Sequence, residues 1–228
     1  SLQKKKEKFT FFCPQRMGIP KGTDILWKAL QFCKSDFQIL QVDWRDTGTD
    51  EENITSLRLR ENLPSQVKLI PMIKRKDIPS YYHSSDAVIG NLRIGSFEYV
   101  ELEAIMCKKP VISFTDKKIK IYVDGKEIES PFIPTTNDPK DIAEVIDNFV
   151  VSAQFRQNIF KKEYDFVQNI SDPKKAGEWW DSLFEKMIKE NPSINRKSSG
   201  ITAKLRMLSF LISNRLYFRK IKNYSRSA

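Results

Sequence analysis

Short apolar runs alternate with stretches of helical spacing between residues 9 and 114, and this alternation restricts the fold more than any other feature. Each run has the length of a strand and predicts a buried strand. The runs lie at residues 9–13, 37–42, 67–70, 87–90 and 110–114. Strands that alternate with helices build βαβ units. The sequence therefore predicts an α/β fold, a Rossmann-like open parallel sheet with helices on both faces.

Helices are expected between these strands and again after the last of them. The first helix follows a loop rich in Pro and Gly, and Thr23 or Asp24 can cap its N-terminus. Residues 118–129 differ, because two short strand-like pieces around Asp124-Gly125 predict a β-hairpin. The other expected helices lie at residues 50–62, 77–84, 99–107, from Asp138 onward, and at 152–168, 172–190 and 201–222.

The positive charge of the chain is concentrated at its C-terminus. The formal net charge is +10, yet residues 196–228 hold nine of the 39 Lys and Arg residues and none of the 29 acids. The rest of the chain is nearly neutral, whereas a nucleic-acid-binding domain would carry its own basic stripe. We therefore expect no nucleic-acid partner. We expect one domain at residues 1–190 and a basic, amphipathic helical tail at 191–228.

The few cysteines and the single histidine exclude several kinds of site. Cys13, Cys33 and Cys107 are widely spaced, so neither a disulfide framework nor a zinc site is expected, and a reducing, cytosolic compartment fits best. The sequence has no Asp-x-Asp pair to hold a divalent ion, so we expect no metal. No apolar run approaches the roughly 20 residues that cross a bilayer. Because the sequence starts at Ser1 rather than Met, we interpret it as part of a longer protein.

The loop after the first strand places two cations five residues apart, Arg16 and Lys21. Loops at the carboxyl ends of the strands form the ligand crevice of an open parallel sheet. An Arg side chain can grip two phosphate oxygens with its planar fork, and a Lys side chain adds a point charge. The pair therefore suits a diphosphate. Two solvated charges in a surface loop are an equally good interpretation of this stretch alone.

The loop after the fourth strand contains Gly95, Ser96, Phe97 and Glu98 and opens a helix. Free N–H groups and the partial positive charge of a helix N-terminus suit a phosphate. Farther along this helix, Glu103 could accept hydrogen bonds from a ribose diol. For Glu98 and Glu101, favourable charge placement at a helix start is the preferred interpretation.

Both stretches in this order, followed by Pro110-Val111-Ile112, resemble the C-terminal, donor-binding domain of glycosyltransferase family 4 (group 1). This is a large retaining group with the two-domain GT-B fold. The first motif is matched by Arg16, Lys21 and Gly22, with Gln15 in place of the family's Gly. The second motif is matched by Glu103, Ala104, Met106, Pro110 and Val111. The resemblance covers about residues 8–190, so this domain would be one half of a GT-B fold.

The resemblance implies that Arg16 and Lys21 are the catalytic cations that hold the donor diphosphate. It also implies that residues 95–98 contact the donor and that Glu103 holds its ribose. The implied reaction is hexosyl transfer with retention, without a metal, from a UDP- or GDP-sugar to an acceptor hydroxyl. The family's first Glu, which contacts the transferred sugar, falls at Gly95. Backbone N–H groups of residues 96–98, or Glu98 on an altered loop path, could replace it.

The resemblance also implies partners that the sequence does not contain. The acceptor would bind to a missing N-terminal domain of the same protein, so this fragment alone is expected to be inactive. Polysaccharide or glycolipid biosynthesis in the cytoplasm would be its setting. A non-catalytic nucleotide- or nucleotide-sugar-binding domain is the alternative, with Gly95 marking a lost activity.

The tail permits two interpretations. A helix over residues 201–222 would carry an apolar stripe flanked by basic residues. Such a helix suits the anionic inner face of a membrane, with the protein held there peripherally. It suits docking on another domain equally well.

Overall fold

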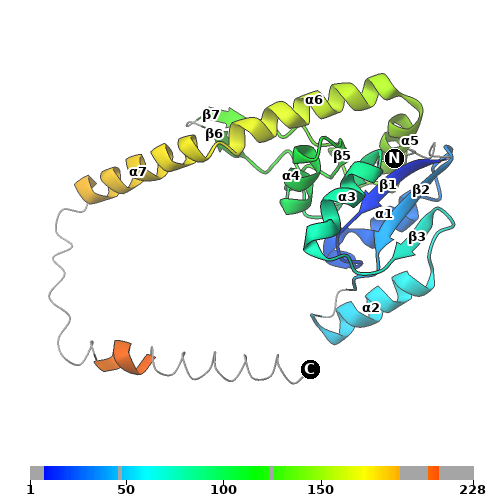
Figure 1. The fold of residues 1–228 in the computed structure, drawn as a ribbon, viewed down its shortest axis with the longest axis horizontal. Helices are drawn as coiled ribbons and strands as arrows, with labels where there is room; N and C mark the ends of the chain where they lie inside the picture. The colour runs from blue at the N-terminus through cyan, green and yellow to red at the C-terminus, as the bar shows by residue number, and fades with distance from the viewer. Residues whose placement is uncertain (1–7, 46–47, 124–125, 191–204, 211–228) are drawn as a thin grey trace. The chain divides into compact units, whose positions relative to one another are not determined.

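The computed structural model describes residues 8–45, 48–123, 126–190 and 205–210 (Figure 1). The chain divides into two compact units, Ser1–Pro173 and Lys174–Ala228. The first unit contains a five-stranded sheet and the helices that cover it.

The five strands of this sheet are all parallel, in the order β3-β2-β1-β4-β5. Their bounds are Phe9–Cys13 (β1), Phe37–Val42 (β2), Val67–Ile70 (β3), Ala87–Ile89 (β4) and Val111–Ile112 (β5). The predicted fold class is confirmed. β5 is shorter than the predicted strand at 110–114, because Pro110 has no N–H group to donate. After Ile112, the N–H of Ser113 turns instead to the carbonyl of Ile133.

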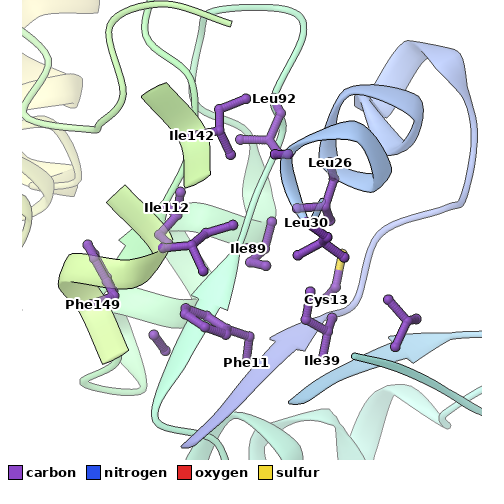
Figure 2. Packing of buried hydrophobic residues seen from close by; sticks show 14 of the residues in the cluster. Phe11, Cys13, Leu26, Leu30, Ile39, Ile89, Leu92, Ile112, Ile142 and Phe149 are labelled. Carbon is purple, nitrogen blue, oxygen red and sulfur yellow. The ribbon is translucent and has the colours of Figure 1, made fainter. Parts of the chain in front are cut away.

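Helices cover both faces of the sheet, as predicted. Neighbouring residues of a strand point to opposite faces, so Phe11 and Phe12 of β1 enter two different cores. Phe11 packs in the cluster of Figure 2, which includes residues of α1 (Thr23–Ala29) and α5 (Pro139–Val151). Phe12 packs with residues of α3 (Ile78–Ser84), α4 (Tyr99–Met106) and α6 (Ala153–Ile170). Burying either ring contributes about 1.5–3 kcal/mol.

The start of α1 differs from the prediction. Gly22 is its N-cap, in a left-handed conformation with φ 73°. The predicted cap by Thr23 or Asp24 is wrong, because the Thr23 hydroxyl accepts a hydrogen bond from the N–H of Gly18 (3.0 Å). A Cβ atom at position 22 would lie 2.9 Å from the carbonyl carbon of Leu92. Glycine therefore lets the loops after β1 and β4 touch.

The remaining helices and the hairpin of the described chain lie close to their predicted positions, and two 3₁₀ turns were not predicted. Helix α2 covers Asp50–Glu61, and two 3₁₀ turns cover Ile19–Lys21 and Arg75–Asp77. The hairpin pairs β6 (Ile121–Val123) with β7 (Lys126–Ile128), while the predicted turn residues Asp124 and Gly125 lie outside the described residues.

Helix α7 (Pro173–Glu190) carries an exposed aromatic row. Trp179 and Trp180 meet edge to face at 4.9 Å, and Trp180 stacks on Phe184 at 5.7 Å. Of the predicted helix at 201–222, only residues 205–210 are described, and they are helical. Within the described parts of the chain, no helix is both long enough and apolar enough to span a membrane.

Candidate functional site

The candidate site lies where the parallel strands end at their carboxyl edge. Three of the loops that leave the sheet there contain the predicted site residues and Arg75, at residues 14–22 after β1, 71–77 after β3 and 90–98 after β4. An open α/β sheet binds its ligands at this edge. The first and third loops contain most of the residues that the sequence selected.

Lys21 and Glu98 form the central ion pair of this site. The ammonium of Lys21 lies 2.7 Å from each carboxylate oxygen of Glu98. The side chains are 17% and 31% exposed, so the pair is partly shielded from water. The structure thus brings the loop after β1 into direct contact with the start of α4. The interpretation of Glu98 as a mere helix-start charge leaves out this contact.

The electrostatics of Glu98 also involve Arg16. Burial acts to raise the pKa of Glu98. Hydrogen bonds from Lys21 and Asn91, followed by the positive charges of Lys21 and Arg16, outweigh burial and leave the pKa below its usual value. The two cations selected from the sequence therefore act on one carboxylate.

Arg16 is placed by contacts with the loop after β2. Its guanidinium carbon lies 5.9 Å from the centre of the Trp44 ring, in a cation–π contact. The N–H of Met17 donates to the Trp44 carbonyl at 2.7 Å, which joins the two loops. Trp44 is therefore an exposed aromatic residue beside the site. No sequence signal separates it from a core tryptophan.

Asn91 organises the loop after β4. Its side-chain amide donates to Glu98 at 2.9 Å, and its side-chain oxygen accepts from the N–H groups of Arg93 (2.8 Å) and Ile94 (3.0 Å). The Arg93 guanidinium donates to the Ile19 carbonyl in the loop after β1 and to both carboxylate oxygens of Asp24 at the start of α1. These hydrogen bonds join the loop after β4 to the loop after β1.

Glu101 supports this loop from inside the protein. Its side chain is completely buried, and its carboxyl oxygens accept from the N–H groups of Asn91 (2.9 Å) and Glu98 (2.8 Å) and from the Ser113 hydroxyl (2.9 Å). Glu101 and Glu98 form a capping box at the start of α4, so the interpretation of Glu101 as a helix-start residue holds in part, but it leaves out the contacts with Asn91 and Ser113. A sequence signal was present, since Glu101 lies between Val100 and Leu102 in an apolar helix.

Gly95 occupies a position that admits no side chain. Its φ is +80°, and a Cβ atom there would lie 2.6 Å from the Cβ atom of Asp116. Its carbonyl accepts from the Asp116 N–H at 2.9 Å, which fixes this approach. Ser96 and Phe97 follow in the same loop, and the Phe97 ring packs on Phe166 at 5.4 Å. The Phe97 side chain therefore holds the loop after β4 against the core.

Glu103 lies apart from the ion pair. Its carboxylate accepts from the Tyr82 hydroxyl at 3.3 Å and lies 3.7 Å from the guanidinium of Arg75. It lines a cavity of about 260 Å³ with apolar residues of α3 and α4. Burial, and secondarily the charge of Glu103, raises the pKa of the Tyr82 hydroxyl, so Tyr82 acts as a neutral donor. Arg75 follows β3, so this cavity belongs to the same edge of the sheet.

The described residues contain no group of three or more His, Cys, Asp or Glu side chains that could hold a metal ion. The sequence-based expectation of a metal-free site stays a prediction. What the geometry offers is a cation, Lys21, at the N-terminus of α4, with Arg16 acting on the same carboxylate and a separate cavity that Glu103 lines.

Comparison with solved structures supports this fold. HepE from Anabaena, in complex with UDP and glucose, superposes with a TM-score of 0.57 at 21% identity, over 77% of this chain and 48% of that chain. Sucrose-phosphate synthase from Thermosynechococcus elongatus superposes with a TM-score of 0.59 at 18% identity, over 81% and 46%. This chain thus spans about half of the length of these proteins. A C-terminal domain of LpcC from Francisella tularensis gives a TM-score of 0.52 at 21% identity, over 70% and 84%.

Sequence comparison gives the family. No curated protein sequence matches the chain significantly. The model of the family "Glycosyl transferases group 1" matches residues 1–166, which include the whole sheet and the site built on it. The chain therefore belongs to the glycosyl transferases of group 1.

Proposed function

We propose that this chain is the donor-binding half of a retaining glycosyltransferase, which transfers a hexose from a nucleotide diphosphate sugar to an acceptor hydroxyl. One observation carries the proposal: in a member of this family, Lys21 contacts Glu98 at the start of α4, and the charge of Arg16 acts on the same carboxylate. HepE binds UDP and glucose in its structure, which supports a UDP-sugar as the first donor to test. A GDP-sugar is the alternative donor.

The site would act by stabilising the leaving group. Negative charge develops on the diphosphate as the sugar departs, and fixed cations and N–H groups stabilise such charge well in a shielded site. Arg16 and Lys21 supply the cations. The N-terminus of α4, which Glu98 caps, adds the partial positive charge of a helix end. Glu103 would hold the ribose in the cavity that it shares with Arg75.

The acceptor would bind to an N-terminal domain, since the chain spans about half of the length of the proteins that it resembles. That domain would orient the acceptor hydroxyl, and orientation supplies much of the rate of a two-substrate reaction. We expect this chain alone to bind donor and to transfer little or no sugar. Cys13, Cys33 and Cys107 are free thiols, which supports a reducing, cytoplasmic setting.

A non-catalytic nucleotide-sugar-binding domain is the second candidate, and Gly95 favours it. The position has no room for the carboxylate that the resemblance places there. Assays of the intact protein with donor and acceptor separate the two candidates, because only the enzyme forms a glycosylated product.

The binding test is calorimetric titration of this chain with UDP, GDP and their glucose conjugates. We expect saturable binding of one nucleotide, and a loss of affinity of about tenfold or more in Arg16→Ala, Lys21→Ala and Glu103→Ala. Lys120→Ala is the matched control, because Lys120 forms a comparable ion pair with Glu127 on the hairpin. Equal affinities in all four variants and the unmodified chain, or no binding by the unmodified chain, would contradict the proposal.

A further inference from the structure

The ion pair between Lys21 and Glu98 has a consequence for ligands that reach the site. A Lys ammonium has three hydrogen-bond donors, and here both oxygens of one carboxylate lie 2.7 Å from it. A phosphate that approaches Lys21 therefore meets a cation that is already neutralised. It also meets the negative charge of Glu98 itself.

Glu98 is held in this position by more than Lys21. The side-chain amide of Asn91 donates to the same carboxylate at 2.9 Å. Rotating the Asn91 amide by 180° would break two other hydrogen bonds, because its oxygen accepts from the backbone N–H groups of Arg93 and Ile94. The backbone N–H of Glu98 is bound to the buried carboxyl group of Glu101. Hydrogen bonds at its backbone and at its carboxylate therefore hold Glu98 against the Lys21 ammonium.

We propose that the Glu98 carboxylate competes with the donor's phosphates for the Lys21 ammonium. Only a ligand that binds strongly enough to displace Glu98 would then occupy the site. The carboxylate occupies Lys21 in the unliganded protein, and a bound diphosphate takes its place on the cation. Small phosphates gain too little from Lys21 alone to displace it. A nucleotide sugar can do so, because its other parts make further contacts. This inference rests on the proposed donor site.

The alternative role for Glu98 is a direct contact with the ligand. Each carboxylate oxygen has two lone pairs, so Glu98 could accept a hydroxyl group while it remains on Lys21. The two roles predict opposite effects of removing the charge. If Glu98 competes with the ligand, removing its charge strengthens ligand binding. If Glu98 contacts the ligand, removing its charge weakens ligand binding.

The test is titration of the chain with inorganic pyrophosphate and with UDP, before and after Glu98→Gln. Gln keeps the size of the side chain and an oxygen for Asn91 but loses the charge. We expect both ligands to bind about tenfold more tightly, or ~1.4 kcal/mol. Glu127→Gln removes one charge from the exposed pair with Lys120 and is the matched control, with unchanged affinity expected. Thermal unfolding of each variant verifies that it is folded.

A double-mutant cycle with Lys21→Ala locates the effect. If Glu98 acts through Lys21, Glu98→Gln changes affinity much less in the Lys21→Ala background. Unchanged or weaker binding by Glu98→Gln, while the unmodified chain binds UDP, overturns this inference and leaves the donor site standing. Tighter binding of UDP by Glu98→Gln than by the unmodified chain, lost in the Lys21→Ala background, supports the inference. No binding of either ligand by any variant overturns the donor site and this inference together.

Discussion

Two buried glutamates, Glu101 of α4 and Glu163 of α6, occupy different environments in the same domain. Both side chains are completely buried. Glu101 accepts three hydrogen bonds, from two backbone N–H groups and one hydroxyl. Glu163 accepts one, from the N–H of Val111 at 3.1 Å, and among the described residues its other oxygen has no hydrogen-bond partner.

The difference separates a residue that shapes the site from one that only packs. The donors to Glu101 come from the loop after β4, from the start of α4 and from the end of β5, so its carboxyl group joins three elements at the candidate site. For Glu163, burial raises the pKa well above its usual value, and the Val111 N–H opposes that rise only in part. Burial of a carboxyl group alone is therefore a poor marker of function. The elements from which its hydrogen-bond donors come are a better one.

The largest expected effect is that of Glu101→Ala. Each buried donor left without a partner costs about 1–3 kcal/mol. The N–H groups of Asn91 and Glu98 lose their acceptor, whereas the Ser113 hydroxyl keeps the Asn91 carbonyl at 3.0 Å. The two N–H groups together predict a loss of about 2–6 kcal/mol in the free energy of unfolding, measured by urea denaturation. UDP binding should disappear, because the loop that places Asn91 and Glu98 loses its support. Glu103→Ala on the same helix is the control, and its loss should stay below about 1 kcal/mol because Glu103 is 43% exposed. A similar small loss for Glu101→Ala would contradict the role assigned to it.

Gly90→Ala tests the same support from the other side. A Cβ atom at position 90 would lie 2.1 Å from a carboxyl oxygen of Glu101, so the carboxyl group would have to move. We expect a loss of about 1–3 kcal/mol in thermal or urea unfolding. Gly177→Ala in α7 is the control, since a Cβ atom there meets nothing within 4 Å. Alanine should stabilise that helix by about 0.5–1 kcal/mol. A neutral Gly90→Ala would show that the carboxyl group is not tightly placed.

Glu163→Gln is expected to change the pH dependence of stability. Between the usual pKa of 4.5 and the raised folded value, the folded protein keeps a proton that the unfolded chain releases. Stability of the unmodified chain therefore falls as pH rises through this window, by about 1.4 kcal/mol per pH unit. Gln cannot titrate but can still accept from Val111, so this component should vanish. Urea denaturation from pH 5 to pH 8 measures it. A stability difference between the two proteins that does not change with pH would contradict the assignment.

The sheet and most helices could be predicted because their signals are local. Strand-length apolar runs and helical spacing indicate where β1 to β4 and the helices of the domain lie, to within a few residues. The short β5 and the cap of α1 could not be predicted. Both depend on contacts with distant segments, namely Ile133 for Ser113 and Leu92 for Gly22.

The site could be predicted in its cations but not in its carboxylates. Arg16 and Lys21 were selected from their spacing in a loop after a strand, and in the structure Lys21 contacts Glu98 while Arg16 lies against Trp44. Glu98, Glu101 and Glu103 lie within six residues of one another and carry similar sequence signals. Their separate roles depend on which side of α4 each faces, and a shift of one residue rotates a side chain by about 100°. Asn91 gave no signal at all, because its role lies in hydrogen bonds to its neighbours.

The smallest expected effect concerns Lys108, on the segment that connects the helix of Glu101 to Val111. Helix α4 ends in a Schellman arrangement, with the N–H of Lys109 bound to the Ala104 carbonyl and that of Lys108 to the Ile105 carbonyl. Lys108 has a φ of 61°, a left-handed conformation that strains any residue except glycine. Lys108→Gly should therefore stabilise the domain by about 0.5–1 kcal/mol in urea denaturation. Lys108→Ala removes the same charge but keeps the Cβ atom, so it should give no such gain. Equal stabilities of the two variants would show that the left-handed backbone at Lys108 stores no strain.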